Sequence, residues 1–103
     1  MKELLMSFAL SFASDYNVEL PKLDFRIRTL PDSICAYTVK DKYAYIISLD
    51  VKGMPEKNIK TLVYNQVGQI MGLPKTTNKR DFMNDKYCLI NFNRVKRYEK
   101  KIH

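Results

Sequence analysis

Histidine is scarce in the sequence: His103 is the only one, and it is the last of the 103 residues. A zinc site of imidazoles, a Ser/His/Asp triad and a Cys/His dyad each need a histidine held in packed surroundings. A residue at a chain end is usually poorly ordered and does not meet that need. The composition therefore excludes most common hydrolytic chemistry, and we expect no enzyme, no cofactor and no bound metal.

Cysteine and long apolar runs are also scarce. Cys35 and Cys88 are the only two cysteines, which argues against a disulfide framework. One disulfide remains open, but two buried free thiols in a reducing compartment are the preferred interpretation, which predicts a cytoplasmic protein. No apolar run approaches the length of a membrane span, so we expect neither an integral membrane protein nor a membrane partner.

What the chain does have is a globular balance and an uneven charge. Hydrophobic residues make up 46% and charged residues 28%, and the length suits one domain over residues 1–103. Residues 1–51 carry six Lys/Arg against seven Asp/Glu, whereas residues 52–103 carry twelve against four. Such an asymmetry hints at an anionic partner for the C-terminal half, although solvated basic faces are common.

The hydrophobic pattern predicts an α+β fold. Leu23, Phe25 and Ile27 alternate with charged residues in the period of a half-buried strand, and two further β-rich runs follow as a hairpin. We expect a small, mostly antiparallel sheet. The predicted elements are an N-terminal helix over Met1–Asp15, the hairpin strands Ile34–Val39 and Tyr43–Leu49, a central helix that is entered at Gly53–Glu56 and ends at Gly72, a long loop over Lys75–Lys86 and a C-terminal helix from about Cys88 to Lys101.

The N-terminal segment has one competing interpretation. Its apolar run resembles a secretory signal, but Glu3 lies where such a signal is positively charged. Ser7, Ser11 and Ser14 recur at helical spacing and form a polar stripe opposite an apolar face. That pattern favours a packed helix, whose apolar side consists of Leu4, Leu5, Phe8 and Phe12.

The most informative segment is Leu62–Tyr87, which reads LVYNQVGQIMGLPKTTNKRDFMNDKY. It resembles the active-site region of metzincin metallopeptidases of the matrixin and archaemetzincin types. Their signature is a helix with H-E-x-x-H-x-x-G-x-x-H, followed by a loop with a Met-turn. Here Asn65, Gln66, Gln69 and Lys75 stand at the His, Glu, His and His positions, and Gly68, Gly72, Leu73 and Met83 match residue types common in the family.

The chemistry of these replacements predicts a vestigial site. Amide oxygens of Asn65 and Gln69 are weak zinc ligands, and the ammonium of Lys75 would repel the metal. Gln66 has no useful basicity near neutral pH and does not activate water as a general base. The resemblance thus implies a catalytically dead, zincin-like domain with a hairpin before the former active-site helix and a Met-turn-like Met83.

A plainer interpretation competes with the vestigial site. Residues 59–72 also fit an ordinary amphipathic helix that ends at a glycine. Asn65 and Gln69 would then lie on the solvent side of that helix, where amides are common. The alternative is that the polar replacements keep a hydrogen-bonding face on the floor of the former cleft.

Two surfaces are candidates for partner binding. Tyr37, Tyr43 and Tyr45 on the predicted hairpin form a possible stacking or protein-binding platform, or are half-buried sheet aromatics. A basic patch for phosphate groups would consist of Lys79, Arg80, Arg94, Arg97 and Lys101. The plainer interpretation of these residues is the solvated end of a helix.

These observations predict a non-catalytic binding module on a metzincin-like scaffold. The chain would recognise a partner protein and act as an inhibitor or adaptor. Tyr43–Leu49 would be the exposed sheet edge that pairs with a partner strand. The alternative is a small basic nucleic-acid-binding protein that uses the C-terminal half.

Overall fold

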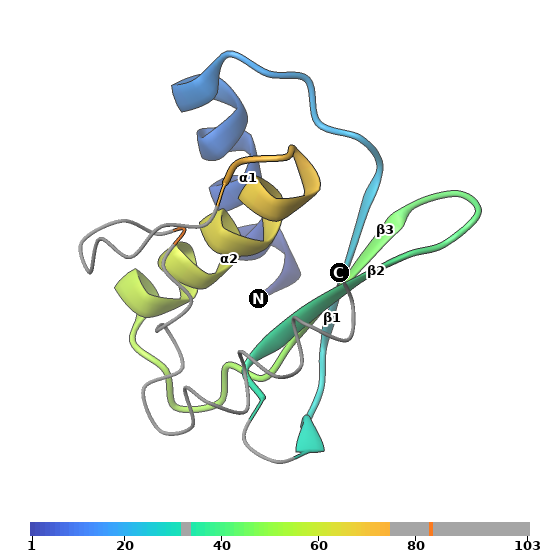
Figure 1. Cartoon of the computed structure of the whole chain (residues 1–103). Coiled ribbons are helices and arrows are strands. Elements are labelled where there is room, and N and C mark those ends of the chain that lie inside the picture. Colours follow the sequence, from blue (N-terminus) through green and yellow to red (C-terminus); the bar gives the residue numbers. More distant parts are fainter. Residues whose placement is uncertain (32–33, 75–82, 84–103) are drawn as a thin grey trace.

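The computed structural model describes residues 1–31, 34–74 and 83, and contains two helices and three strands (Figure 1). Both helices lie on one face of a small sheet and pack against each other. The α+β class predicted from the hydrophobic pattern is confirmed. In chain order the elements are α1 (Lys2–Tyr16), β1 (Leu23–Ile27), β2 (Ala36–Lys40), β3 (Tyr45–Leu49) and α2 (Glu56–Ile70).

Helix α1 buries the apolar face that its sequence predicts. Leu5, Phe8 and Phe12 recur at helical spacing and are buried in the core. The helix ends at Asn17, which adopts the left-handed conformation (φ 51°) and turns the chain toward the sheet. Asparagine tolerates that conformation better than most residues, so it can end a helix where glycine is absent.

Helix α2 follows Pro55, whose fixed φ suits the start of a helix. It ends in a Schellman motif around Gly72, which has a φ of 84°. The N–H of Gly72 donates to the carbonyl of Gln69 (3.1 Å), and the N–H of Leu73 donates to the carbonyl of Gly68 (2.9 Å). The predicted helix stop at Gly72 is therefore confirmed, with the sharp turn that glycine permits.

The sheet is mixed, with strand order β1-β3-β2. β1 pairs with β3 in parallel and β2 pairs with β3 in antiparallel fashion, so the expectation of a mostly antiparallel sheet is wrong. The hairpin itself is confirmed. Its turn has no glycine but is closed by Asp41, whose N–H donates to the carbonyl of Ala44 (2.8 Å) and whose carboxylate accepts the N–H of Lys42 (2.7 Å).

The strand order corrects the predicted binding edge. The second hairpin strand, predicted over Tyr43–Leu49, begins at Tyr45 and occupies the centre of the sheet as β3. The edges belong to β1 and β2. The sequence showed which strands form the hairpin, but not which hairpin strand β1 pairs with, because that depends on how the whole sheet packs under the helices.

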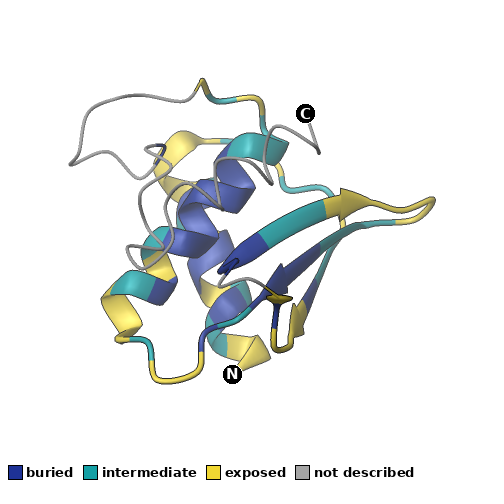
Figure 2. Ribbon diagram, turned by 60° about the horizontal axis from the view of Figure 1, so that its bottom comes forward, coloured by how far each residue is buried: buried dark blue, intermediate teal, exposed yellow. Residues whose placement is uncertain are grey.

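The core lies between the helix layer and the sheet (Figure 2). Phe25 of β1 and Ile47 of β3 are register partners on the helix-facing side, and both are buried. Thr38 of β2 is the third member of that row and faces α2. The core residues contributed by the helices are Leu5, Phe8, Ala9, Phe12, Ile59, Leu62, Val63, Tyr64 and Val67.

Cys35 lies just before β2 and is disulfide-bonded. The prediction of free thiols is therefore wrong for this residue, because two cysteines far apart in sequence give no information on their distance in the fold. The other cysteine, Cys88, lies outside the described residues, as do the predicted loop Lys75–Lys86 apart from Met83 and the predicted C-terminal helix from about Cys88 to Lys101. Among the described residues, no helix is both long and apolar enough to cross a membrane.

Candidate functional site: a buried amide cluster beside the sheet edge

Asn65, Gln66 and Gln69, which align with the His, Glu and His of the metzincin signature, form one hydrogen-bonded group on α2. Asn65 and Gln69 lie one helical turn apart, and Gln69 Nε2 donates to Asn65 Oδ1 (2.8 Å). Gln66 Nε2 donates to the same oxygen (3.2 Å). Gln66 Oε1 in turn accepts a hydrogen bond from Thr38 Oγ1 on β2 (2.7 Å). We call Thr38, Asn65, Gln66 and Gln69 the amide cluster.

The amide cluster is largely removed from solvent. Asn65 is 3% and Gln66 is 4% exposed, whereas Gln69 is half-buried. The interpretation that Asn65 lies on the solvent side of an amphipathic helix is therefore wrong. Buried amides are costly unless paired, and in the described part of the chain every buried side-chain nitrogen or oxygen has a partner. The cluster thus binds α2 to β2 by complementary polar groups instead of by apolar packing.

The cluster explains why a threonine occupies the helix-facing side of β2. Ile47, its register partner, is fully buried, and an apolar residue would be expected beside it. Thr38 instead supplies the hydroxyl that Gln66 needs. Sequence reasoning identified Asn65, Gln66 and Gln69 but missed Thr38. The signal available in the sequence was a polar residue at the inward-facing position of a strand.

Two other residues of the predicted vestigial site are only partly placed. Met83 is buried (3% exposed), as a Met-turn residue would be, although its sequence neighbours are not described. Lys75 lies outside the described residues, which end their continuous run at Pro74. The structure therefore shows the turn at Gly72 that leads toward Lys75, but not the lysine itself.

The chemistry available to the amide cluster is hydrogen bonding. Its side chains carry no charge, and an amide acts neither as a general acid nor as a general base near neutral pH. Within the residues that the structure describes, no group of three or more His, Cys, Asp or Glu side chains is arranged to hold a metal ion. A neutral, buried and internally paired cluster holds α2 and β2 in a fixed relative position.

The free edge of β2 lies next to the amide cluster. The N–H of Asp50 donates to the carbonyl of Cys35 (2.8 Å), which fixes the direction of the backbone groups along β2. Because these groups alternate, the N–H and C=O of Ala36, Thr38 and Lys40 point away from β3. No strand of the described residues pairs with this edge. Thr38 therefore offers its backbone to the edge and its side chain to the cluster.

The hairpin tyrosines do not share one face. Tyr37 faces the side of the sheet away from the helices, and Tyr45 faces the helix side. Tyr43 lies in the turn and not on a strand, is 72% exposed, and has the ammonium of Lys42 5.5 Å from its ring centroid. A single platform of three tyrosines is thus not formed. Tyr43 and Tyr45 instead line a hollow of about 120 Å³ at the hairpin turn, together with Lys22, Lys40 and Lys42.

A polar contact between the two helices was not predicted. The hydroxyl of Tyr64 on α2 donates to Asp15 Oδ2 (2.7 Å) and lies 3.0 Å from Ser11 Oγ on α1. Burial, followed by the hydrogen bond to Asp15, raises the pKa of the Tyr64 phenol. Its ring meets Phe12 edge-to-face at 5.3 Å. The serine stripe on α1 was the available signal, since it placed Ser11 on a face that a polar partner could use.

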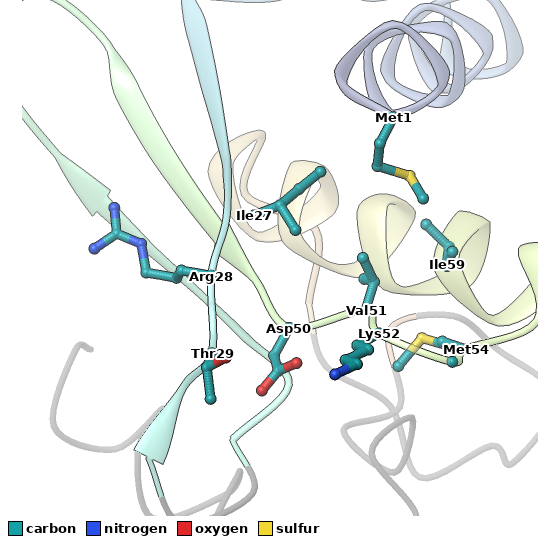
Figure 3. Close-up of a pocket in the computed structure, with 10 residues that line it drawn as sticks. Met1, Ile27, Arg28, Thr29, Asp50, Val51, Lys52, Met54 and Ile59 are labelled. Carbon is teal, nitrogen blue, oxygen red and sulfur yellow. The ribbon is translucent and has the colours of Figure 1, made fainter.

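A separate cavity of about 520 Å³ opens where β1 and β3 end (Figure 3). Among the described residues that line it, Asp50 supplies the only carboxylate, which accepts the N–H of Leu30 (3.0 Å), and the guanidinium of Arg28 points away from the apolar side chains. The apolar part of its lining consists of Met1, Ile27, Val51, Met54 and Ile59.

Comparison with known proteins adds no relative to this geometry. The chain matches no protein-family model, no curated protein and no solved structure. The residues of the predicted basic patch, namely Lys79, Arg80, Arg94, Arg97 and Lys101, lie outside the described residues.

Proposed function

We propose that this chain is a non-catalytic protein-binding module on a metzincin-like scaffold, and that its binding edge is β2. The observation that carries the proposal is the amide cluster beside an edge of β2 with which no strand of the described residues pairs. The cluster occupies three of the four positions at which the resembling family has its ligands and general base. Hydrogen-bonded amides at these positions support a scaffold that keeps a recognition surface without zinc or hydrolysis.

The edge of β2 suits an extended segment of a partner protein. Ala36, Thr38 and Lys40 offer backbone groups for a ladder, and such main-chain pairing is a common mode of peptide recognition. Val39, 47% exposed on the other face of the same strand, adds apolar surface that a partner residue would cover. The described edge would therefore provide affinity through the backbone and specificity through neighbouring side chains.

The proposal is tested by two substitutions at one residue. Lys40→Pro removes an N–H that points away from β3, so it weakens partner pairing without removing a hydrogen bond within the sheet. Lys40→Ala is the matched control, because it also loses the side chain and its contact with the Tyr45 ring (5.6 Å) but keeps the N–H. We expect the immobilised parent and Lys40→Ala to capture the same protein from a lysate, and Lys40→Pro to lose it.

The same capture experiment separates the alternative function. A nucleic-acid-binding protein would release its partner steeply as salt rises, because cations on the protein replace counterions on the phosphates. Capture of DNA or RNA that is abolished by salt and unchanged in Lys40→Pro would contradict the proposal and favour the basic C-terminal half.

The cytoplasmic location stays a prediction. It was inferred from free thiols, and the disulfide at Cys35 is more typical of proteins in oxidising compartments.

A further inference from the structure

The second free edge of the sheet, on β1, has its own pattern. The N–H of Arg28 donates to the carbonyl of Leu49 (2.9 Å), which fixes the backbone direction along β1. The N–H and C=O groups of Leu23, Phe25 and Ile27 therefore point away from β3. Within the described part of the chain, no strand pairs with these groups.

The charges on β1 are arranged symmetrically about Phe25. Asp24 and Arg26 flank it, lie on the face of the sheet away from the helices, and form an exposed ion pair with each other (3.1 Å). An isolated exposed pair of this kind contributes little to stability. The two charges are also self-complementary: when β1 of a second copy runs antiparallel alongside, the acidic residue of each strand faces the basic residue of the other.

We propose that β1 pairs antiparallel with β1 of a second copy of this chain, with Phe25 opposite Phe25. This register brings outward-pointing backbone groups together, since Leu23 then faces Ile27 of the second copy. It also places Asp24 opposite Arg26 of the second copy in a non-hydrogen-bonded position, where side chains lie closest. The pairing joins two three-stranded sheets into one of six strands with two-fold symmetry.

Neighbouring registers fit less well. Centring the pair on Asp24 places two carboxylates opposite each other, and centring it on Arg26 places two guanidinium groups opposite each other. The other free edge does not offer the same fit, because β2 has only Lys40 as a charged residue and no acidic partner for it. Charge complementarity therefore selects β1 and one register.

The surroundings of β1 support the same occupant. Ile27 is 43% exposed although it lies on the helix-facing side of its strand, where Phe25 is 4% exposed. A hollow of about 310 Å³ opens between the start of α1 and β1, lined in part by Met6 and Leu23. In the proposed register, Ile27 of one copy lies beside Leu23 of the other, next to this hollow. Ile27 of each copy would then cover the hollow of the other copy, so this contact is made twice, once on each side of the two-fold axis.

The interface is short, so we expect a weak dimer. A five-residue strand is about 17 Å long, and pairing over that length falls below the size of most stable interfaces. Sedimentation velocity on the full chain, from about 1 µM to 1 mM, should show a monomer that becomes a dimer as concentration rises.

Charge reversal tests the register. Asp24→Arg and Arg26→Asp, each alone, place like charges opposite each other and should weaken dimerisation by about tenfold or more. The double variant Asp24→Arg/Arg26→Asp restores both cross-strand pairs and should dimerise like the parent. Ile27→Lys should weaken the dimer, and Val39→Lys, at a similarly exposed position on β2, should not.

A parent that remains monomeric over the whole range would overturn the proposal. So would a dimer that the single charge reversals leave unchanged, or one that Val39→Lys weakens and Ile27→Lys does not. Circular dichroism of each variant establishes that the fold is retained, and the double variant provides the decisive comparison if one single variant is destabilised.

Discussion

At the scale of single residues, the most informative feature is the group of neutral amides at buried positions of α2. Gln66 donates to Asn65 and accepts from Thr38, so both ends of its amide are used. A carboxylate of the same size can accept from Thr38 but has no hydrogen for Asn65. The amide at position 66 is thus required by its neighbours as they stand in this chain.

Gln66→Glu should destabilise the protein in a pH-dependent way. Burial would raise the pKa of the new carboxyl group, so the folded state would hold its proton to a higher pH than the unfolded chain does. Stability is then lost as pH rises above about 4.3, with a cost of about 2–4 kcal/mol at pH 7. Urea unfolding at pH 4 and pH 7, against the parent, measures this difference. If Gln66→Glu changes the free energy of unfolding by the same amount at pH 4 and at pH 7, the result would contradict the burial of this site.

Tyr64→Phe should cost about 1 kcal/mol at neutral pH, because it removes the hydrogen bond from α2 to Asp15 on α1. The raised pKa of Tyr64 adds a second expectation. The folded state keeps the phenol proton to a higher pH than the unfolded chain, so the parent loses stability as pH rises above about 10. Thermal unfolding between pH 8 and pH 11 should show a steeper alkaline loss for the parent than for Tyr64→Phe. Parallel curves would contradict the contact.

At the scale of elements, periodicity predicted both described helices and all three strands. Leu5, Phe8 and Phe12 in α1, and Ile59 and Val63 in α2, recur where a helix buries one face. Local patterns were less able to predict how strands pair. A parallel partner for β1 depends on contacts between residues about twenty positions apart, and no short-range signal records them.

Gly72→Ala should destabilise the protein by about 1 kcal/mol. No atom lies within 4 Å of the position where a Cβ would be added, so the cost comes from the left-handed backbone (φ 84°) and not from a clash. Gly72→Asn is the matched control, because asparagine adopts this conformation more readily and should cost less. Chemical denaturation of the three proteins measures the order. Equal stabilities of parent and Gly72→Ala would show that the Schellman turn does not constrain this position.

At the scale of the whole molecule, the fold brings together residues that are far apart in the sequence. Thr38 and Gln66 are 28 positions apart and share a hydrogen bond, which no motif predicted. The sequence identified three members of the amide cluster through a resemblance, but their burial required the packed fold. The edge of the sheet was assigned to the wrong hairpin strand for the same reason, because edges are properties of a complete sheet.

The central proposal is that Asn65, Gln66 and Gln69 stand where the resembling metallopeptidases have two zinc ligands and the general base, with Lys75 at the position of the third ligand. Zinc titration of the variant Asn65→His/Gln66→Glu/Gln69→His/Lys75→His tests it most directly. As a control, Lys57→His/Thr61→His places two histidines at the same spacing nearer the start of α2, outside the cluster. The account predicts that the parent binds no stoichiometric zinc. It also predicts that the fourfold variant binds zinc at least about tenfold more tightly than the control, because a third histidine that converges on the first two would add a ligand that the control lacks. A fourfold variant that folds and binds zinc no better than the control would contradict the account.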